Sequence, residues 1–306
     1  MVRPLGAAGR GSDMEELYGF HEVEPGCRLE KEFRGGALCF VRLSSAPELK
    51  PWLELLNELW GFSAEDRIPL HEAVVAVKTG GLFLGAEWSG APAGLVYVLP
   101  AFSRERGGHH HSNFMGFVPE HRSRGLGLEA KRAHVILARR EGVNLVTWTF
   151  DPLQTANANL NFRKLGALCR TYLPDLYGSM GGNFDPGLPS DRFLVEWRLD
   201  TERVESRLRG AVPAPGELAR KFATAPVIGE NLNPERSAAT PGPLLLEIPA
   251  AALELARSEP ETARRLLAGF RDRAAALFAA GFAVTEMLPS AGRESADYYV
   301  LEKGVF

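Results

Sequence analysis

A loop rich in glycine and arginine lies near the middle of the chain. The segment RSRGLG, residues 122–127, falls between a predicted strand, residues 113–118, and a predicted helix, residues 126–141. Glycines let the backbone turn tightly and approach a ligand, and the N–H groups of a helix N-terminus point at bound anions. Arg122 and Arg124 can add charge-assisted hydrogen bonds. The pattern predicts a phosphate-binding loop, and an exposed loop with no ligand is the alternative.

Several other catalytic and phosphate-binding motifs are absent from the sequence. It contains no G-x-x-x-x-G-K-[ST] and no third glycine at the spacing of a dinucleotide-binding loop. It also lacks H-E-x-x-H and G-x-S-x-G. These absences argue against P-loop and Rossmann nucleotide sites, zinc peptidases and α/β-hydrolases.

The composition is that of an ordinary globular protein. The 306 residues are 45% hydrophobic and 24% charged, and 35 basic against 38 acidic side chains give a formal net charge of −3. This charge argues against nucleic acid as a partner. No apolar run reaches the length of a membrane span, and the three cysteines lack a C-x-x-C spacing. We therefore expect a cytoplasmic protein of one or two domains without a membrane partner.

Periodicity and turn residues predict the elements along the chain. Residues 1–35 lack a clear period and are expected to form a tail (residues 1–12) and a loosely attached segment. Beyond them, the pattern predicts alternating strands and helices. The predicted strands are 38–43, 81–87, 92–100, 113–118, 144–150, 169–173 and 192–199, and the predicted helices are 45–60, a short one within 67–79, 126–141 and 155–165.

The last third of the chain divides into two predicted parts. Residues 201–242 are expected to be a linker or surface excursion, because the stretch 209–242 is rich in proline and glycine. Residues 243–306 then predict a smaller β-α-β-β unit. Its strands are 243–248, 282–288 and 296–302, and its helix is 259–280.

The glycine loop and the element order resemble the GNAT superfamily of N-acetyltransferases, whose acetyl-CoA loop has the form Arg/Gln-x-x-Gly-x-Gly/Ala after the fourth strand. Other segments resemble one subfamily of predicted acyltransferases. These segments are Thr147-Trp-Thr-Phe-Asp-Pro-Leu-Gln154, Asn157 with Asn161 before Lys164-Leu-Gly166, Tyr177-Gly178 and Leu188-Pro-Ser-Asp-Arg-Phe193. The resemblance implies a GNAT acyltransferase domain over residues 36–200. The fold class would be α/β (α+β), a mixed and mostly antiparallel sheet with helices on both faces, completed by the C-terminal unit.

The same resemblance implies where acetyl-CoA or another acyl-CoA, such as succinyl-CoA, would bind. The backbone of Phe117 and Val118 would pair with the pantetheine arm as with an added strand. The amides of Arg122, Arg124, Gly125, Leu126 and Gly127 would take the pyrophosphate. Asn157 and Asn161 would lie on the other side of the cofactor. Arg163 or Lys164 would approach its phosphates, or simply form a solvated helix face.

The resemblance also raises the question of the general acid. Many members carry a tyrosine that protonates the leaving thiolate, and the matching position here is Phe162. Tyr172 and Tyr177 are candidate replacements, and the thiolate leaving without a protein acid is the alternative.

Three side chains are candidates for the base that takes a proton from the acceptor ammonium. They are His111, whose ordinary pKa lies near neutrality, Glu120 and Asp151. Asp151 could instead cap the turn that follows it. His109 and His110 are interpreted as parts of an exposed loop. No metal site is expected, because adjacent histidine side chains diverge and no other ligands are suitably spaced.

Asp191 and Arg192 could bind the acceptor, because an arginine can hold a carboxylate with two hydrogen bonds. A structural ion pair at a loop corner is the alternative. Cys169 is expected to be a buried hydrophobic residue rather than a nucleophile. The tryptophans expected in the core are Trp52, Trp60, Trp148 and Trp197.

The resulting hypothesis is direct transfer of an acetyl or succinyl group from acyl-CoA to the amine of a small molecule, preferably an amino acid. A protein N-acetyltransferase is a second enzymatic hypothesis. A non-catalytic acyl-CoA-binding or regulatory protein, or a structural α/β domain, are alternatives from other classes. A homodimer is the default expectation for the assembly.

Overall fold

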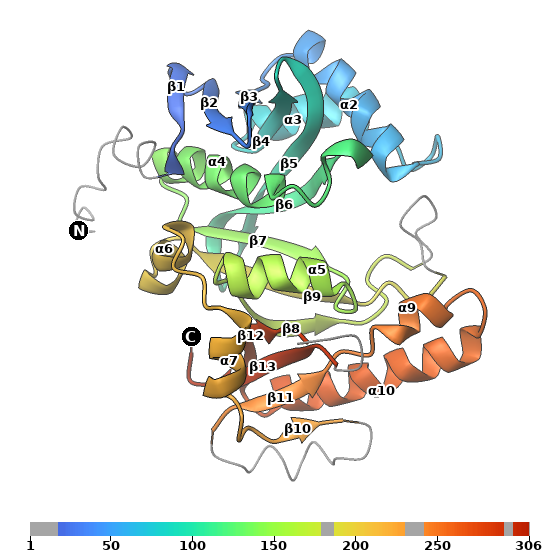
Figure 1. Ribbon diagram of the computed structural model, residues 1–306. Helices are drawn as coiled ribbons and strands as arrows, with labels where there is room; N and C mark the ends of the chain where they lie inside the picture. Colours follow the sequence, from blue (N-terminus) through green and yellow to red (C-terminus); the bar gives the residue numbers. More distant parts are fainter. Residues whose placement is uncertain (1–17, 179–186, 230–241, 291–295, 306) are drawn as a thin grey trace. The chain divides into compact units, whose positions relative to one another are not determined.

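The strand, loop and helix predicted at the glycine motif are all present in the computed structural model (Figure 1). It describes residues 18–178, 187–229, 242–290 and 296–305, so the expected tail, residues 1–12, lies outside the described part. The chain divides into two units, residues 1–146 and 147–306. This division differs from the sequence-based boundaries, which place one domain over residues 36–200.

The first unit contains a six-stranded sheet in which neighbours along the chain are neighbours in space, and every pairing is antiparallel. Its strands are β1 (His21–Glu24), β2 (Arg28–Phe33), β3 (Gly36–Arg42), β4 (Leu82–Trp88), β5 (Ala91–Ser103) and β6 (Gly107–Phe117). Its helices are α2 (Ala46–Trp60), α3 (Leu70–Lys78) and α4 (Leu126–Arg140). The predicted β4–β5 hairpin is confirmed.

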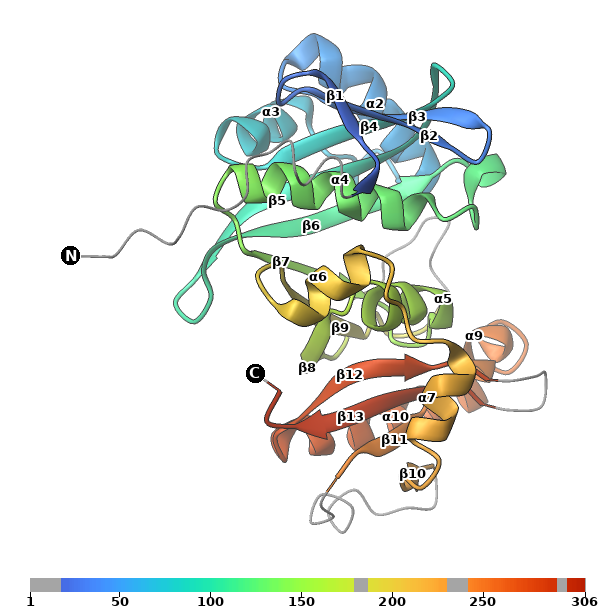
Figure 2. The same ribbon diagram turned by 60° about the vertical axis from the view of Figure 1, so that its left-hand side comes forward.

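Helices cover both faces of this sheet (Figure 2). Tyr97 of β5 packs in the hydrophobic core with α2 and α3. Val98 points the opposite way, because successive side chains of a strand alternate between faces. Val98 pairs with Ser112 of β6, and Ser112 contacts Lys131 of α4. The glycine loop therefore leads from β6 into a helix on the face opposite α2 and α3.

Local sequence signals account for the ends of α2. The Glu48 carboxylate accepts hydrogen bonds from the N–H groups of Ser44 and Ser45, at 2.9 and 3.0 Å, which satisfies donors at the start of the helix. Gly61 ends the helix with a φ of 65°. Trp52 is buried as predicted, and Trp60 packs at the edge of the same core.

Residues 18–35 are integrated into the first unit, so the expectation of a loosely attached segment is wrong there. β2 pairs with β3 along its whole length. The Lys31 ammonium lies 2.6 Å from the Glu129 carboxylate of α4 and donates to the Tyr18 carbonyl at 2.9 Å. The charge of Lys31 is paired with Glu129, which is 98 residues away in the sequence. The sequence around β2 therefore shows charged residues without showing that one of them is buried and paired.

The second unit contains a mixed, mostly antiparallel sheet, as predicted. Its strands, in spatial order, are β7 (Leu145–Phe150), β9 (Arg192–Arg198), β8 (Leu168–Leu173), β12 (Phe282–Leu288), β13 (Tyr298–Lys303), β11 (Leu244–Glu247) and β10 (Val227–Ile228). Only β10 and β11 are paired in parallel among the pairings established within this unit. Its helices are α5 (Thr155–Ala158), the π-helix η2 (Asn159–Lys164), α6 (Glu202–Leu208), α7 (Pro215–Lys221), α9 (Ala251–Leu255) and α10 (Pro260–Ala279).

The segment expected to be a linker has more regular structure than its composition suggests. Residues 202–228 include α6, α7 and β10, and Pro215 opens α7 at a position where its missing N–H is harmless. The predicted C-terminal strands and long helix are present. They continue the sheet of the second unit, because β12 pairs with β8 at Val284 and Cys169.

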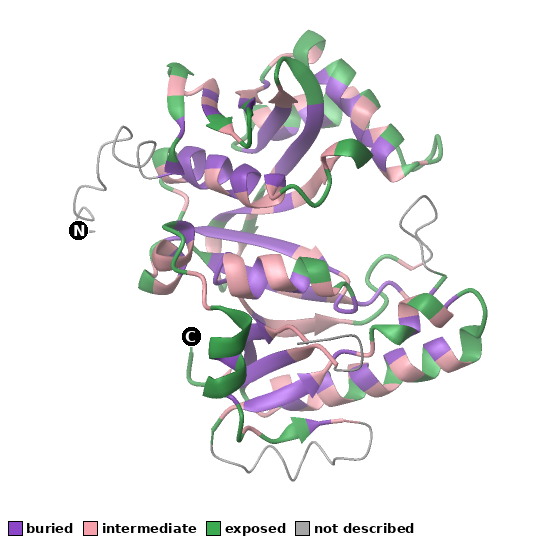
Figure 3. Cartoon of the chain, in the orientation of Figure 1, coloured by how far each residue is buried: buried purple, intermediate pink, exposed green. Residues whose placement is uncertain are grey.

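Buried residues concentrate along β4, β5, α4, β7 and β12 (Figure 3). Cys169 has no exposed surface, as expected of a small hydrophobic residue, and Trp148 and Trp197 are also buried. No helix in the described part of the chain is long and apolar enough to cross a membrane.

Candidate functional site

The glycine loop has the backbone geometry of an anion-binding helix start. A 3-10 turn, η1 (Pro119–His121), follows β6, and Gly125 then serves as the N-cap of α4 with a φ of 87°. This left-handed conformation favours glycine strongly over other residues. The N–H groups at the very start of a helix are those that a bound anion meets, and in α4 the N–H of Leu128 donates to the Gly125 carbonyl at 3.1 Å. Arg124 is exposed beside them.

Two arginines, one within the glycine loop and one from the turn between β2 and β3, lie at this helix start. Arg122 donates from Nε to the carbonyl of Phe117 at 3.0 Å, which fastens the loop to the end of β6. On the other side of the loop, a Cβ atom added at Gly125 would lie 3.8 Å from Arg34 Nη2, in the β2–β3 turn. Arg34 therefore adds positive charge that the sequence motif alone does not reveal.

The structure narrows the predicted pantetheine contacts. The N–H of Val118 donates to the Ala93 carbonyl at 2.9 Å, and the carbonyl of Val118 accepts from the N–H of His121 at 2.9 Å. The Val118 N–H is thus already used within the chain. Phe117, by contrast, has a carbonyl that accepts from Arg122 and retains a second lone pair. Of the two positions, Phe117 fits the predicted role better.

His109 and His110 lie in β6 and are buried, so their interpretation as an exposed loop is wrong. His110 Nε2 lies 3.0 Å from the Gly80 carbonyl and Nδ1 lies 3.1 Å from Nε2 of His134. The carbonyl requires a proton on Nε2, which leaves Nδ1 of a neutral His110 as the acceptor. Burial is the main reason why the pKa values of His110 and His134 are lowered.

The two base candidates of the first unit differ in accessibility. His111 is half-buried in β6, and its pKa is lowered to about 4, mainly by burial. It lies six residues before Phe117, about 20 Å along an extended strand. Glu120 is exposed on η1, next to the glycine loop. Glu120 is therefore the candidate nearer in sequence to the predicted cofactor loop.

In the second unit, four polar side chains lie at one end of β7. The hydroxyls of Thr149 and Tyr177 are 2.8 Å apart, and the Arg192 guanidinium lies 5.5 Å from the centroid of the Tyr177 ring. Asp151, two residues after Thr149, accepts from the N–H of Leu153 at 2.9 Å. Burial raises the pKa of Asp151, and the charge of Arg192 opposes that rise.

Asp151 caps the following turn, as one of its two sequence-based interpretations has it, and it also lies within the electrostatic reach of Arg192. Its role as a base stays a prediction. Tyr177 is 48% exposed, so its phenol can meet a ligand. The structure thus brings together three predicted site residues, Asp151, Tyr177 and Arg192. Thr149 joins them, and its place within the Thr-Trp-Thr-Phe-Asp segment is the signal that could have identified it.

Asp191 has a structural position instead of the expected role in acceptor binding. Its side chain is 1% exposed and is held by Arg271 of α10, from Nε to Oδ2 at 2.8 Å and from Nη2 to Oδ1 at 2.6 Å. Tyr172 donates to Oδ2 at 2.5 Å, and the N–H of Asp175 donates to Oδ1 at 2.9 Å. The structural ion pair considered above is therefore correct, but its partner is Arg271 rather than Arg192.

Tyr172 cannot replace the missing acid, because its hydroxyl is engaged with Asp191. Burial is the first cause that raises its pKa, and the hydrogen bond to Asp191 adds to the rise. Phe162 has no exposed surface and packs against Phe150 and Tyr299. Among the candidate acids, Tyr177 is the one that combines an exposed hydroxyl with polar neighbours.

Asn157 and Asn161 have different environments on α5 and η2. Asn157 is exposed, whereas Asn161 is 3% exposed and its Nδ2 has no hydrogen-bond partner in the described part of the chain. Because buried polar groups normally have a hydrogen-bond partner, this N–H donor is available to an acceptor atom of a ligand. The amide of Asn161 can thus donate to a ligand, and the cofactor contacts of both residues stay predictions. Arg163 instead bonds Asn159 and the Pro213 carbonyl, at 2.6 and 2.9 Å.

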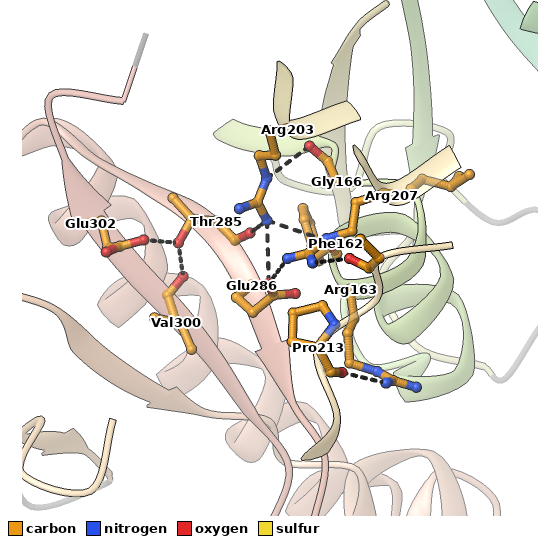
Figure 4. Close-up of polar contacts among 12 residues, drawn as sticks. Phe162, Arg163, Gly166, Arg203, Arg207, Pro213, Thr285, Glu286, Val300 and Glu302 are labelled. Carbon is orange, nitrogen blue, oxygen red and sulfur yellow. Dashed lines mark hydrogen bonds and ion pairs between the residues drawn. The ribbon is translucent and has the colours of Figure 1, made fainter. Parts of the chain in front are cut away.

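Asn161 lies in a π-helix, where the N–H of Leu165 donates to the carbonyl of Leu160 at 2.9 Å. Such segments are uncommon and frequent at functional sites. Figure 4 shows Arg203 of α6 at the end of this helix. It donates to the carbonyls of Phe162 and Gly166, at 3.4 and 3.0 Å, and to that of Thr285.

A buried carboxylate completes this network. Glu286 of β12 accepts from Arg207 at 2.7 Å and lies 3.4 Å from Arg203, and burial raises its pKa. The carbonyl contacts of Arg203 stabilise the end of η2 as a C-terminal cap does. A segment expected to be a linker thus supports the helix that presents Asn161, and no local sequence signal indicates this contact.

Comparison with known proteins identifies similar solved structures. No family model matches the chain, and neither does any curated protein. A GNAT-family acetyltransferase from Streptococcus pneumoniae is 16% identical with a TM-score of 0.40, over 52% of this chain and 97% of its own. The IAA acetyltransferase of Bacillus cereus is 15% identical with a TM-score of 0.40, over 53% of this chain and 99% of its own.

A third similar structure is Arabidopsis thaliana Naa50 in complex with the bisubstrate analogue CoA-Ac-MVNAL. It is 13% identical with a TM-score of 0.39, over 51% of this chain and 97% of its own. Two of these three structures are named as acetyltransferases, and one of those two as a member of the GNAT family.

Proposed function

We propose that the protein is an acyl-CoA-dependent N-acyltransferase that transfers an acetyl or succinyl group to the amine of a small molecule, preferably an amino acid. The observation that carries this proposal is the glycine loop, in which Gly125 adopts a left-handed φ and begins α4 directly after β6. Exposed Arg124 and nearby Arg34 add positive charge where a pyrophosphate would lie. Anions are favoured at such a helix start.

Residues of the glycine loop and of the end of β6, all in the first unit, are assigned to the acyl-CoA. Arg122, Arg124 and the amides of Gly125, Leu126 and Gly127 would hold the pyrophosphate, and Phe117 would pair with the pantetheine arm. Within the second unit, Asn157 and Asn161 stay predicted ligand contacts, and the Nδ2 of Asn161, which has no hydrogen-bond partner among the described residues, is the donor proposed there. When bound, acyl-CoA would supply an acyl group activated as a thioester.

In the overall transfer, a bond forms between the amine nitrogen and the acyl carbon while the carbon–sulfur bond breaks. The acceptor ammonium must lose a proton, and the leaving sulfur gains one. We assign the acid to Tyr177, because its hydroxyl is exposed and hydrogen-bonded to Thr149. Asp151 is the preferred base, since burial raises its pKa towards the working range of a base. Glu120 and His111 remain the other candidates.

Arg192 is assigned to the carboxylate of an amino acid acceptor. Its guanidinium stacks on Tyr177 and its charge opposes the rise that burial causes in the pKa of Asp151, so its positive charge lies close to both proposed proton-transfer groups. An arginine can hold a carboxylate with two parallel hydrogen bonds, which would orient the neighbouring amine. This contact is the basis for preferring an amino acid over a neutral amine.

The proposal is tested by calorimetric titration with CoA, acetyl-CoA and succinyl-CoA. Gly125→Glu should weaken binding at least about 100-fold, because a carboxylate would repel the pyrophosphate, whereas Gly125→Ala carries the same backbone strain without the charge. A large loss with glutamate and a small one with alanine would support the loop assignment. Equal affinities for wild type and Gly125→Glu would refute it, and the acyl preference would identify the donor.

A non-catalytic acyl-CoA-binding protein is the second candidate, favoured by the buried, apolar position of Phe162. A thiol-release assay with acetyl-CoA or succinyl-CoA and the standard amino acids separates the two. Turnover with an amino acid would support the enzyme, and tight binding without turnover on amino acids or peptides would favour the second candidate. Turnover on peptides alone would indicate a protein N-acetyltransferase.

A further inference from the structure

The Asp191 carboxylate forms hydrogen bonds both with α10 and with the loop that carries Tyr177. Both of its carboxylate oxygens accept hydrogen bonds from Arg271, at 2.8 and 2.6 Å, in the two-bond geometry that arginine makes with carboxylates. The same carboxylate accepts the N–H of Asp175 at 2.9 Å. The guanidinium of Arg271 thus neutralises the charge of the Asp191 carboxylate, which is only 1% exposed.

From Asp175 the contacts continue to Tyr177. The Asp175 carboxylate accepts the N–H of Ser190 at 2.9 Å, and the hydroxyl of Ser190 accepts the N–H of Tyr177 at 2.8 Å. The N–H of Leu176 also donates to the Ser190 carbonyl at 3.1 Å. Successive backbone groups of the loop are therefore tied to the segment that contains Ser190 and Asp191.

This loop requires such support. Asp175 has a φ of 43°, a left-handed conformation that costs energy in a residue other than glycine. Leu176 and Tyr177 are 42% and 48% exposed, so hydrophobic burial holds the tip of the loop only in part. Hydrogen bonds to Asp191 and Ser190 must supply the order that positions the Tyr177 hydroxyl beside Thr149.

We propose that Arg271 is a positioning residue for acyl transfer: by fixing Asp191, it holds the loop that presents Tyr177. The inference rests on the proposed function, because it takes Tyr177 as the group that acts on the substrate. It assigns a role to the C-terminal segment, which supplies α10. Lysine would keep the charge of Arg271 but could not make both hydrogen bonds from one planar group.

The experiment compares wild type, Arg271→Ala, Arg271→Lys and the control Arg264→Ala. Arg264 lies on the same helix and is exposed, and its ion pair with Glu261 does not involve the Tyr177 loop. Thermal melting first establishes which variants are folded at the assay temperature. Hydrogen exchange of the peptide spanning residues 174–178, kcat, KM for the acceptor and Kd for acyl-CoA are then measured.

We expect Arg271→Ala to increase exchange in residues 174–178 at least 10-fold and to lower kcat 10-fold or more, with the acyl-CoA Kd changed less than twofold. Arg271→Lys should recover part of kcat, and added guanidinium ion should partly rescue the alanine variant. Arg264→Ala should match wild type. Unchanged exchange in a folded Arg271→Ala protein would overturn the proposal.

A double-mutant cycle with Tyr177→Phe tests whether Arg271 acts through Tyr177. If it does, Arg271→Ala lowers kcat less than twofold in the Tyr177→Phe background, because the group being positioned is already absent. An equal, multiplicative loss in both backgrounds would overturn the proposal. If the wild type binds no acyl-CoA, it is the proposed function that fails, and the exchange measurement alone then decides whether Arg271 anchors the loop.

Discussion

The ring of Phe162 lies edge-on to the ring of Tyr299, with 5.7 Å between the ring centroids. The hydroxyl of Tyr299 donates to the Pro152 carbonyl at 2.6 Å, so the buried hydroxyl of this pair of rings is satisfied. The ring of Phe150 also packs against Phe162, with 5.9 Å between the ring centroids. The position at which the family resemblance leads us to expect a tyrosine is thus part of the hydrophobic core.

Phe162→Tyr should therefore lower stability without raising activity. The new hydroxyl would be buried among aromatic rings, and an unsatisfied buried hydroxyl costs about 1–3 kcal/mol. Urea denaturation measures this cost, and thiol release from acyl-CoA measures the rate. Phe162→Leu, which changes packing without adding a hydroxyl, is the control. An increase in kcat with unchanged stability would show instead that position 162 faces the reacting groups.

Tyr177→Phe should lower kcat about 100-fold, within the range of a general acid. The substitution keeps the ring that stacks with Arg192 and removes only the hydroxyl bonded to Thr149. Affinity for acyl-CoA, measured by calorimetry, should remain within twofold of wild type. Thr149→Val removes the partner of the hydroxyl and should have a smaller effect. Full activity of Tyr177→Phe would exclude the phenol as the acid.

Elements that depend on local signals were predictable from the sequence. The ends of α2 follow from Ser45 and Gly61, and the glycine loop predicts the start of α4. The hairpin of β4 and β5 follows from a short turn between apolar runs. In each case the residues that determine the structure are close together in the chain.

Two residues whose interpretation from the sequence was wrong contact residues far away in the chain. His110 reads as an exposed loop residue because its partner, His134, is 24 residues away. Asp191 reads as a substrate ligand because Arg271 is 80 residues away, and the adjacent Arg192 is the obvious candidate for its partner. No local periodicity reports such pairings, so a buried charge and a functional charge look alike in the sequence.

Lys31→Met should destabilise the first unit by about 3 kcal/mol, the scale of breaking a buried ion pair. Its ammonium lies 2.6 Å from the Glu129 carboxylate and also contacts the rings of Phe20 and Phe33, at 4.7 and 5.3 Å. The double variant Lys31→Met, Glu129→Leu should recover part of the loss, because the single variant leaves a buried carboxylate that has lost its Lys31 partner and keeps its ion pair with Arg132, at 2.9 Å. Urea denaturation of the four proteins of this cycle provides the measurement. Equal stability of Lys31→Met and wild type would contradict a structural role for this pair.

Lys131 should make the stability of the protein depend on pH above neutrality. It is 2% exposed, its ammonium lies 3.0 Å from the Ser112 hydroxyl, and burial lowers its pKa from 10.5 to about 7. Between these two pKa values the unfolded chain binds a proton that the folded chain lacks. The free energy of unfolding contributed by this residue therefore rises with pH across that window, by about 1.4 kcal/mol per pH unit. Below pH 7 both states are protonated, and the full cost of burying the charge remains.

Replacing the pair by Lys131→Met and Ser112→Ala removes this dependence and leaves no hydroxyl without its partner. The double variant should be more stable than wild type at pH 7, and its advantage should shrink by about 1.4 kcal/mol per pH unit between pH 7.5 and 9.5. Taking the difference between the proteins cancels the titration of other groups, such as Cys39, whose pKa burial raises to about 12. Lys78→Met, at an exposed position of α3, is the control and should show no slope. A constant difference across this range would mean that Lys131 stays protonated in the fold, held by a charge partner rather than neutralised by burial.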